Sequence, residues 1–469
     1  MRKRSRASMQ LTFFCNFAAV FKHLQNMAQT IYFLGIGGIG MSALARFFMQ
    51  RGDKVYGYDH MQTAITEQLR KEGAFIHFEE DPTMIPTDVD FVVYTPAIHP
   101  DHLEFRYFKE KEIPIYKRSQ VLGNLAKGHP TIAVAGTHGK TTTTAMITQL
   151  LRPYREVMAF IGGIAKNIDS NFLINKDFDT VIAEADEFDR SFLTLFPTLA
   201  IITSMDADHL DVYGDRNHLV ESFQLFANQI DKSGYLLIHE KVAEQIRHPH
   251  KLVYGEGEGC DFRISDIRLG ANRAFFTLHC PSQILAEISI GVSGRHNVQN
   301  SAAACAAALL CGLTEEQIRT QMSGFNGVKR RFDYQIERND LVYIDDYAHH
   351  PEEIRSILTA VKGIYPDREL TVVFQPHLYT RTRDFGPQFA EVLALADRVI
   401  LLDIYPAREE PIPGITSQWL LNMIATTDKR LLLKEELLPF LQQNRPEVLL
   451  TVGAGDIDKL VPKIREALT

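Results

Sequence analysis

The segment Gly136–Thr144, with the sequence GTHGKTTTT, has the residue types of a phosphate-binding loop. It follows an apolar stretch and precedes a helical pattern, so glycine amides and a helix start can face an anion. Lys140 adds a positive charge for the β- and γ-phosphates, and Thr141 offers a hydroxyl to Mg²⁺. The P-loop match is incomplete, because Val134 stands where the first glycine is expected. The segment predicts a nucleotide phosphate site, with a polar helix cap as the alternative.

A magnesium ion held by a threonine hydroxyl and phosphates also needs a carboxylate. Glu184 follows the expected strand 180–183 and opens the sequence EADEFD, in which other carboxylates could also serve. The expected strand 199–203 leads in the same way to Asp206 and His209. Magnesium prefers oxygen, so His209 is as readily a hydrogen-bonding residue as a ligand. Glu184 is therefore the carboxylate that the sequence favours.

A second glycine turn, Gly35–Gly40, follows the expected strand 31–34 and opens a helix over 41–50. Its G-x-G-x-x-G spacing lets backbone amides approach a diphosphate. Asp59, at the end of the next expected strand, 54–58, would suit NAD. A sugar nucleotide also carries a diphosphate, and a tight turn without a ligand has the same pattern. The motif alone does not choose among these.

Size and composition exclude several classes of protein. With 469 residues the chain exceeds what one hydrophobic core supports, so several domains are expected. The formal charge of -8 provides no basic excess for a nucleic-acid surface. The cysteines are odd in number and never spaced C-x-x-C, which predicts neither a disulfide frame nor a zinc site. They are Cys15, Cys260, Cys280, Cys305 and Cys311.

The first residues loosely imitate a signal peptide, because basic residues precede the apolar run 11–21. Asn16 interrupts that run, and no clear cleavage site follows. We therefore expect a disordered extension over residues 1–28, or an upstream start codon with Met27 as the natural beginning. No later stretch approaches the length of a membrane span, so we expect a protein that does not engage a membrane. The cysteine usage fits a reducing compartment, and a cytoplasmic location is expected.

Strands alternate with helical patterns in three successive segments, which predicts an α/β protein with parallel sheets. We expect domains over residues 29–126, 127–330 and 331–469. The second contains a strand-rich part over 235–291 and a helix of small residues over 301–310. Expected strands of the third are 341–344, 370–374, 399–402 and 448–452.

Eight motifs in this order resemble those of the Mur ligase family, and the resemblance runs from Met27 to the C-terminus. They are GIGGIGMSALA (Gly35–Ala45), GTHGKTTTT (Gly136–Thr144), EADEFD (Glu184–Asp189), DADHLD (Asp206–Asp211), GRHNVQN (Gly294–Asn300), KRRFD (Lys329–Asp333), DDYAHHP (Asp345–Pro351) and FQPHLYTRTRDF (Phe374–Phe385). Several motifs in the family's order are far more specific than any one of them.

The resemblance implies a Rossmann-like N-terminal domain for a UDP sugar, a central P-loop-type ATPase domain, and a Rossmann-like C-terminal domain that closes and admits an amino acid. It implies an ATP-dependent ligase with Mg²⁺, or Mn²⁺ in its place, that forms an acyl phosphate in peptidoglycan precursor synthesis. The glycine turn is most similar to members that join L-alanine to UDP-N-acetylmuramate. DADHLD lacks the modified lysine of other members, which agrees with that type. A monomer or a dimer is expected.

Site residues follow from the resemblance. ATP is assigned to Gly136, Thr137, His138, Gly139, Lys140, Thr141, Thr142, Asn297, Asn300 and Arg331. The UDP sugar is assigned to Gly35, Gly37, Gly38, Ile39, Gly40, Asp59, Thr95, Ala97 and Arg118. The amino acid is assigned to His349, Arg381 and Arg383, and the metal ions to Thr141, Glu184 and His209. Catalytic roles are assigned to Lys140, Arg331, Asp346, His349 and His350.

Other readings remain open for some of these residues. Without the resemblance, Asn297 and Asn300 would be read as helix caps. Arg381 and Arg383 could belong to a solvated helix face. In the loop that follows Thr95, residues 99–102 depart from the family, which often has an asparagine there.

Three other functions compete with the alanine-adding ligase. A nicotinamide-dependent dehydrogenase would explain the glycine turn and Asp59 but not the Lys140 loop. A P-loop switch or partner-binding ATPase would explain that loop without any ligation. A related ligase would attach a ready-made peptide to the same sugar nucleotide.

Overall fold

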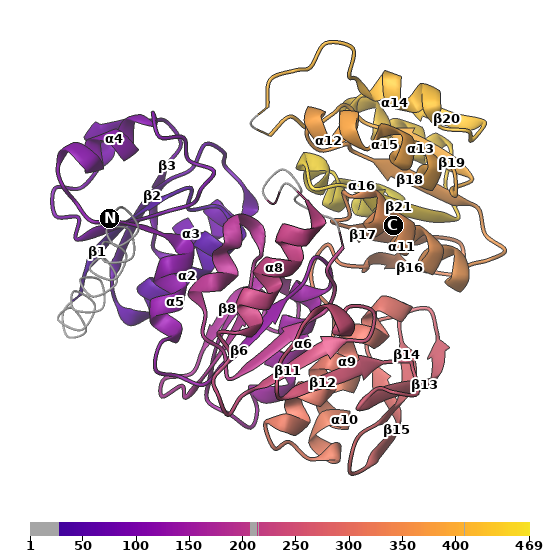
Figure 1. Cartoon of the computed structure of the whole chain (residues 1–469). Coiled ribbons are helices and arrows are strands. Elements are labelled where there is room, and N and C mark those ends of the chain that lie inside the picture. Colours follow the sequence, from indigo (N-terminus) through magenta and orange to yellow (C-terminus); the bar gives the residue numbers. More distant parts are fainter. Residues whose placement is uncertain (1–27, 207–212, 214, 408) are drawn as a thin grey trace. The chain divides into compact units, whose positions relative to one another are not determined.

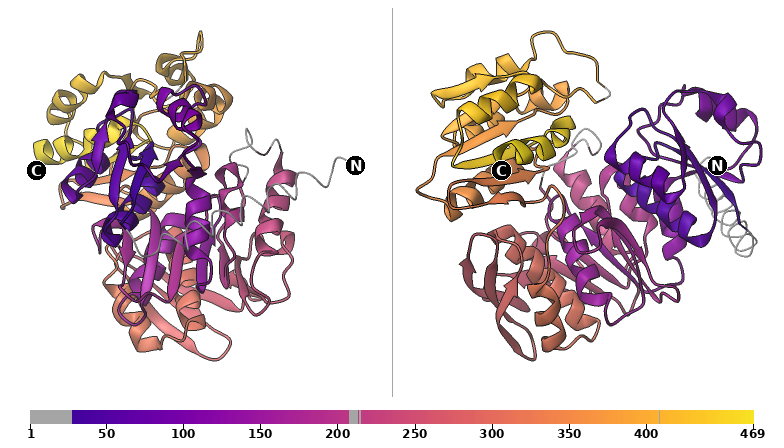
Figure 2. Two further views of the ribbon diagram at one scale, coloured as in Figure 1. Left: turned by 90° about the vertical axis from the view of Figure 1, so that its left-hand side faces the viewer. Right: turned by 180° about the vertical axis from the view of Figure 1, so that it is seen from behind.

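The computed structural model describes residues 28–206, 213, 215–407 and 409–469 (Figure 1). Apart from Ala28, the expected N-terminal extension lies outside the described residues. The chain forms two compact units. The first unit comprises the residues up to Ile164 together with Ile168–Val253, and the second comprises Ala165–Asn167 together with Tyr254–Thr469. Figure 2 gives two further views of the same elements.

A five-stranded parallel sheet opens the first unit, with the order β3-β2-β1-β4-β5. Its strands are β1 (Thr30–Leu34), β2 (Lys54–Tyr58), β3 (Phe75–His77), β4 (Phe91–Tyr94) and β5 (Ile115–Lys117). Its helices are α2 (Ile39–Arg51), α3 (Ala64–Glu72), α4 (Leu103–Glu110) and α5 (Arg118–Ala126), with a short η1 (Pro82–Met84). The strand order reverses beside β1, and in such sheets ligands bind at the carboxyl ends of the strands near this switch point.

Both faces of β1 are buried, which explains its unbroken apolar sequence. Ile31 and Phe33 join the core that contains α2 and α5, while Tyr32 and Leu34 join the core that contains α4. Helices therefore cover both faces of the sheet (Figure 1). The strand is fixed in register, because a slip by one residue would exchange the two sets of side chains.

Six strands in the first unit, in the order β11-β10-β6-β9-β7-β8, form one end of a ten-stranded sheet. Its strands are β6 (Thr131–Ala135), β7 (Val157–Ala165), β8 (Ser170–Ile174), β9 (Thr180–Glu184), β10 (Leu199–Ile202) and β11 (Tyr235–His239). The helical elements are α6 (Lys140–Leu151), η2 (Phe188–Thr194), α8 (Arg216–Ala227) and η3 (Ala243–Gln245). Strand β6 pairs in parallel with β9 on one side and β10 on the other, so the carboxyl ends of these three strands meet at one edge.

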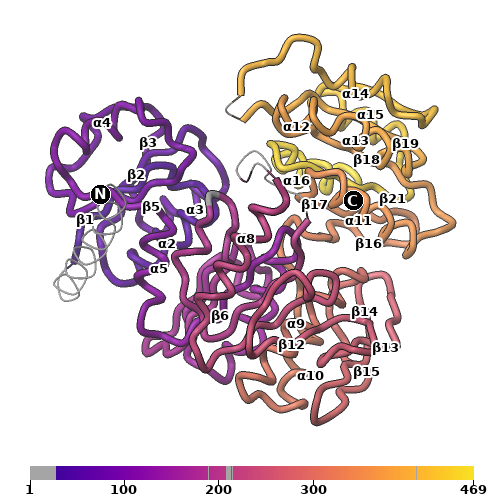
Figure 3. The backbone as a smooth tube through the Cα atoms, in the orientation of Figure 1, coloured from indigo at the N-terminus to yellow at the C-terminus, as the bar shows by residue number. Residues whose placement is uncertain are grey.

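The second unit begins within β12 (Lys251–Gly255), where the chain leaves the first unit. An antiparallel run of β13 (Phe262–Leu269), β14 (Ala274–His279) and β15 (Ile284–Ile290) follows. Helices α9 (Arg295–Leu310) and α10 (Glu315–Ser323) come next. The tube in Figure 3 traces this path.

A six-stranded sheet completes the second unit, with the order β16-β17-β21-β18-β19-β20. Only the edge strand β16 pairs antiparallel. The strands are β16 (Asp333–Glu337), β17 (Val342–Asp346), β18 (Leu370–Phe374), β19 (Arg398–Leu401), β20 (Asp428–Leu431) and β21 (Val448–Val452). The helices are α11 (Pro351–Ile364), α12 (Tyr379–Asp384), α13 (Gly386–Leu393), α14 (Ser417–Met423), α15 (Lys434–Gln443), η4 (Asp456–Lys459) and α16 (Val461–Leu468).

The expected α/β class with parallel sheets is confirmed, and most expected strands agree with the structure to within a residue or two. The expected helix 301–310 is too short, because α9 begins at Arg295. Gly294, the residue immediately before this helix, has a φ of 102°, a conformation that glycine adopts without strain. Among the described helices, none has the length and apolar character needed to cross a membrane.

Candidate active site

The loop before α6 is shaped by two glycines and held by the end of β10. Gly136 and Gly139 have φ values of 132° and 81°, and no side chain caps α6, so its first amides stay directed into the loop. A Cβ at Gly136 would lie 2.1 Å from Oγ1 of Thr203. The hydroxyl of Ser204 accepts a 2.8 Å hydrogen bond from the amide of His138. The loop can therefore bring backbone amides close to an anion.

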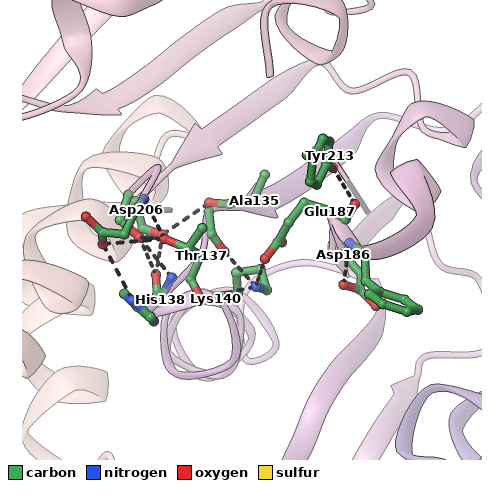
Figure 4. Close-up of polar contacts among 12 residues, drawn as sticks. Ala135, Thr137, His138, Lys140, Asp186, Glu187, Asp206 and Tyr213 are labelled. Carbon is green, nitrogen blue, oxygen red and sulfur yellow. Dashed lines mark hydrogen bonds and ion pairs between the residues drawn. The ribbon is translucent and has the colours of Figure 1, made fainter. Parts of the chain in front are cut away.

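Lys140, the first residue of α6, folds back over this loop (Figure 4). Its Nζ donates to the carbonyl of Gly136 at 2.6 Å and to Oε1 of Glu187 at 2.9 Å. Burial alone would lower the pKa of Lys140, but the charge of Glu187 and of two neighbouring carboxylates outweighs burial and raises it. The lysine is therefore a fixed positive charge at this candidate phosphate loop.

Of the three residues assigned to metal ions, Thr141 and Glu184 are described, while His209 lies outside the described residues. Thr141 is buried in the first turn of α6, and Oε2 of Glu184 accepts a hydrogen bond of 3.0 Å from the amide of Gly162. In the described part of the chain, no group of three or more His, Cys, Asp or Glu side chains is arranged to hold a metal ion. The oxygen donors of Thr141 and Glu184 fit the chemistry of Mg²⁺.

The glycine turn between β1 and α2 forms the second candidate anion site. Gly35 has a φ of 83°, and its amide donates to the carbonyl of Tyr58 at 2.8 Å. Gly38 begins α2 without a side-chain cap, which leaves the helix N-terminus open to an anion. Asp59 accepts a 2.8 Å hydrogen bond from the amide of Gly37, so this carboxylate shapes the turn itself.

Other residues assigned to the UDP sugar gather around the same turn. A Cβ at Gly35 would lie 2.6 Å from Cγ2 of Thr95, and one at Gly40 would lie 2.8 Å from Nη1 of Arg118. Ala97 is exposed in the loop after β4. Nη2 of Arg118 lies 3.3 Å from Oδ2 of Asp186, in the EADEFD segment.

Asn171 on β8 is a residue that the sequence did not single out. Its side-chain amide donates to the carbonyl of Ile39 at 2.6 Å and to the hydroxyl of Ser42 at 3.0 Å, and its Oδ1 accepts from Arg46. It is fully buried. It thus fixes the first turns of α2, the helix that follows the glycine turn, against β8. This strand belongs to the same sheet as β6, which precedes the Lys140 loop. Nothing local distinguishes it, because its contacts lie far away in the sequence.

In the second unit, Asp346 ends β17 and binds two backbone amides. It accepts from Phe332 at 2.6 Å and from Ala348 at 2.8 Å. Burial raises the pKa of Asp346 to about 6, while Arg331 opposes the rise. The guanidinium of Arg331 lies 5.3 Å from the centroid of the Tyr347 ring. Arg331 and Asp346 are therefore brought together, as members of one charged cluster.

His349 and His350 precede α11, as expected from Pro351 at its start. Both of their amides donate to Oε2 of Glu353, at 3.0 Å and 3.1 Å. His350 is buried with its ring 4.8 Å from that of Phe385, whereas His349 is partly exposed. His349 is thus the histidine of the pair with better access to a ligand.

The helix-cap reading of Asn297 and Asn300 is wrong, because Gly294 precedes α9 and both asparagines lie inside the helix. Both are buried, and the side chain of Asn297 donates to the carbonyl of Ser293 at 2.7 Å. His296 lies beside them, and burial lowers its pKa to about 4. Its ring centroid is 5.7 Å from that of Phe332.

Arg381 and Arg383 share the short helix α12. Arg383 is exposed and its Nε donates to Oδ1 of Asp384 at 2.7 Å, as the solvated-face reading expects. Arg381 is partly buried. Oε2 of Glu409 accepts from the amide of Thr380 at 3.0 Å and so holds the N-terminus of this helix.

Three family models match the chain. They are described as Mur ligase family, catalytic domain, over residues 30–130; Mur ligase middle domain, over 134–308; and Mur ligase, glutamate ligase domain, over 330–455.

Curated relatives and solved structures agree with these matches. A UDP-N-acetylmuramate--L-alanine ligase from Phocaeicola vulgatus is 46% identical over 450 residues, which cover 94% of this chain and 98% of the relative. A UDP-N-acetylmuramate-alanine ligase structure from Thermotoga maritima aligns with a TM-score of 0.80 at 28% identity, covering 93% of this chain and 98% of that one. A murein peptide ligase from Psychrobacter arcticus aligns with a TM-score of 0.69 at 22% identity, covering 94% and 99%, and this likeness shows the fold alone.

Proposed function

The chain belongs to the Mur ligase family, and we propose that it joins L-alanine to the carboxylate of UDP-N-acetylmuramate at the expense of ATP. The products are UDP-N-acetylmuramoyl-L-alanine, ADP and phosphate, and the reaction belongs to peptidoglycan precursor synthesis. The choice of substrates is supported by curated relatives named UDP-N-acetylmuramate--L-alanine ligase, which match nearly the whole chain.

The observation that carries the proposal is the presence of two separate candidate phosphate sites in the first unit. One lies at the N-terminus of α2, beside the glycine turn, and the other at the N-terminus of α6, beside Lys140. A ligase that uses ATP to activate a sugar nucleotide must hold two phosphorylated substrates at once. A dehydrogenase would need only the first site, and a P-loop switch only the second.

Each segment of the chain receives one substrate in this proposal. Residues 29–126 bind the UDP sugar, residues 127–330 bind ATP, and residues 331–469 admit L-alanine. The buried Asn297 and Asn300 of α9 are proposed to meet the adenine, and Arg381 and His349 the alanine.

Activation is needed because a carboxylate repels an amine nucleophile and oxide is a poor leaving group. The carboxylate of UDP-N-acetylmuramate attacks the γ-phosphorus of ATP, and ADP leaves. Lys140 offsets the charge that builds up on the phosphoryl oxygens, because its ammonium is fixed at the loop. Thr141, Glu184 and His209 would hold Mg²⁺, or Mn²⁺ in its place, which neutralises phosphate charge when bound.

The amine of L-alanine then attacks the acyl phosphate and expels inorganic phosphate. This step requires the amine as a free base. We propose that His349 positions the amine or accepts its proton, because it is partly exposed and its Nδ1 is already held at 3.0 Å from the carbonyl of Tyr347. We propose that the charged cluster of Arg331 and Asp346 takes part in the same reaction.

A phosphate-release assay with UDP-N-acetylmuramate and a panel of amino acids and short peptides tests the function. The proposal predicts release that requires both the sugar nucleotide and L-alanine. Release with a peptide but not with L-alanine would identify a peptide-adding ligase instead. Release that ignores both substrates would identify an ATPase without ligation.

A further inference from the structure

The ammonium of Lys140 has all of its donors engaged within the protein. A lysine side chain has three N–H donors. Its Nζ lies 2.6 Å from the carbonyl of Gly136, 3.5 Å from that of Thr137 and 2.9 Å from Oε1 of Glu187. The two carbonyls belong to the loop itself and cannot leave without unfolding it. Glu187 is the exchangeable member, because a side chain can rotate away.

Glu187 is held in place from its backbone as well as from its side chain. The hydroxyl of Tyr213 donates to the carbonyl of Glu187 at 2.6 Å, and the short helix η2 starts at the next residue (Figure 4). The side chain is fully buried, and its Oε2 has no hydrogen-bond partner among the described residues. Burial raises the pKa of Glu187, and the charge of Lys140 opposes this rise, so the contact with Lys140 is what favours the ionised carboxylate in the buried site.

We propose that Glu187 is a resident counter-ion of Lys140, and that the terminal phosphates of the nucleotide replace it when they bind. This inference rests on the proposed function only in placing a nucleotide at the Lys140 loop. Phosphate oxygens and the Glu187 carboxylate are both anions, and they compete for the same ammonium donors.

The exchange has a consequence for the cation that accompanies the nucleotide. Glu184 and Asp186 also act on Lys140, so the three carboxylates at this site outnumber its two cations, Lys140 and Arg118. A nucleotide brings further negative charge and displaces the carboxylate that Lys140 had neutralised. Nucleotide binding should therefore be weak unless a divalent cation restores the balance, and Glu187 should account for part of that dependence.

Titration of ADP into the protein in the presence of a chelator measures the competition directly. Glu187→Gln keeps the shape of the side chain but removes its charge, and we expect it to tighten metal-free ADP binding roughly tenfold or more. The gain should shrink when Mg²⁺ is present. Glu187→Ala is the second variant, in case the glutamine variant folds poorly. It keeps the backbone carbonyl that binds Tyr213, and it should also tighten metal-free ADP binding.

Asp186→Asn is the matched control. It removes an equal charge at the neighbouring residue, but the Asp186 side chain bonds Arg118 rather than Lys140. We expect it to tighten ADP binding less than Glu187→Gln does. Equal effects of the two variants, or unchanged or weaker ADP binding in both Glu187 variants, would overturn the exchange. Because only ADP binding is measured, failure to ligate L-alanine would refute the proposed function and leave this inference standing.

Discussion

Arg118 and Asp186 join the two candidate phosphate sites of the first unit through a contact of 3.3 Å between Nη2 and Oδ2. Arg118 also lies against Gly40 of the glycine turn, and Asp186 directly precedes Glu187, the partner of Lys140. A short series of contacts thus leads from the glycine turn, the proposed UDP-sugar site, to the Lys140 loop, the proposed ATP site.

Removing this contact should weaken the thermodynamic coupling between the two substrates. Both side chains are partly exposed, so the pair contributes no more than about 1 kcal/mol. We expect Asp186→Asn to change by a few-fold the ratio of UDP-N-acetylmuramate affinities measured with and without ADP. Calorimetric titration supplies both affinities, and Asp231→Asn, in the turn at the amino end of β11, is the control. An unchanged ratio in Asp186→Asn would show that the contact does not transmit binding.

Gly40→Ala should impair the sugar nucleotide selectively. Its Cβ would lie 2.8 Å from Nη1 and 2.9 Å from Cδ of Arg118, so the arginine must move. We expect weaker UDP-N-acetylmuramate binding by roughly tenfold or more, with ADP affinity retained. Gly363→Ala, whose Cβ would meet nothing within 4 Å, serves as the control and should bind both ligands as the wild type does. Equal loss of both ligands in Gly40→Ala would point to misfolding instead.

Lys140→Ala should abolish acyl phosphate formation but preserve binding of UDP-N-acetylmuramate. The lysine contacts the α6 loop and Glu187, whereas the glycine turn is built from β1, α2 and Asp59. Phosphate release should fall by at least about a hundredfold, because a fixed charge at the phosphoryl group is lost. Calorimetry that finds no UDP-N-acetylmuramate binding to the variant would contradict the separate assignment of the two sites.

Glu104 should make the stability of the first unit depend on pH. It is fully buried, accepts a 2.6 Å hydrogen bond from the hydroxyl of Tyr32, and has its pKa raised by burial to about 7. A carboxyl with a raised folded-state pKa stabilises the protein fully below its unfolded pKa, and this contribution is lost as the pH rises through about 7.

The wild type should therefore lose stability relative to Glu104→Gln between about pH 5 and pH 8, by an amount on the order of 3 kcal/mol. Urea unfolding of both proteins across this range measures the difference. The comparison with the variant separates Glu104 from the buried His102, whose pKa is lowered by burial. A difference that stays constant with pH would refute the assignment.

Local sequence was sufficient to predict the backbone of the two candidate phosphate sites, because glycines, a strand end and a helix start are encoded within a few residues. The loop at Gly136 and the turn at Gly35 both adopt the positive φ values that such sites require. The parallel sheets followed from alternating strands and helices, although their strand order depends on long-range pairing.

Contacts between segments that lie far apart in the chain could not be predicted from the sequence. EADEFD offers four carboxylates, and only the turn after β9 determines that Glu187 faces Lys140 while Asp186 faces Arg118. Asn171 clamps α2 from a strand more than a hundred residues away along the chain. The helix-cap interpretation of Asn297 and Asn300 was wrong for a local reason. The small residues suggested a helix from residue 301, but α9 starts directly after Gly294.

The most direct test of the account follows the oxygen of the activated carboxylate. UDP-N-acetylmuramate with isotopically labelled carboxylate oxygens is incubated with ATP, Mg²⁺ and L-alanine, and the released phosphate is examined by mass spectrometry. Attack of the carboxylate on ATP predicts that each phosphate carries one labelled oxygen and that the sugar nucleotide gains an alanyl group. Unlabelled phosphate, with its new oxygen drawn from water, would contradict the acyl phosphate. It would also contradict transfer of a phosphoryl group from ATP at one site to the sugar nucleotide at the other.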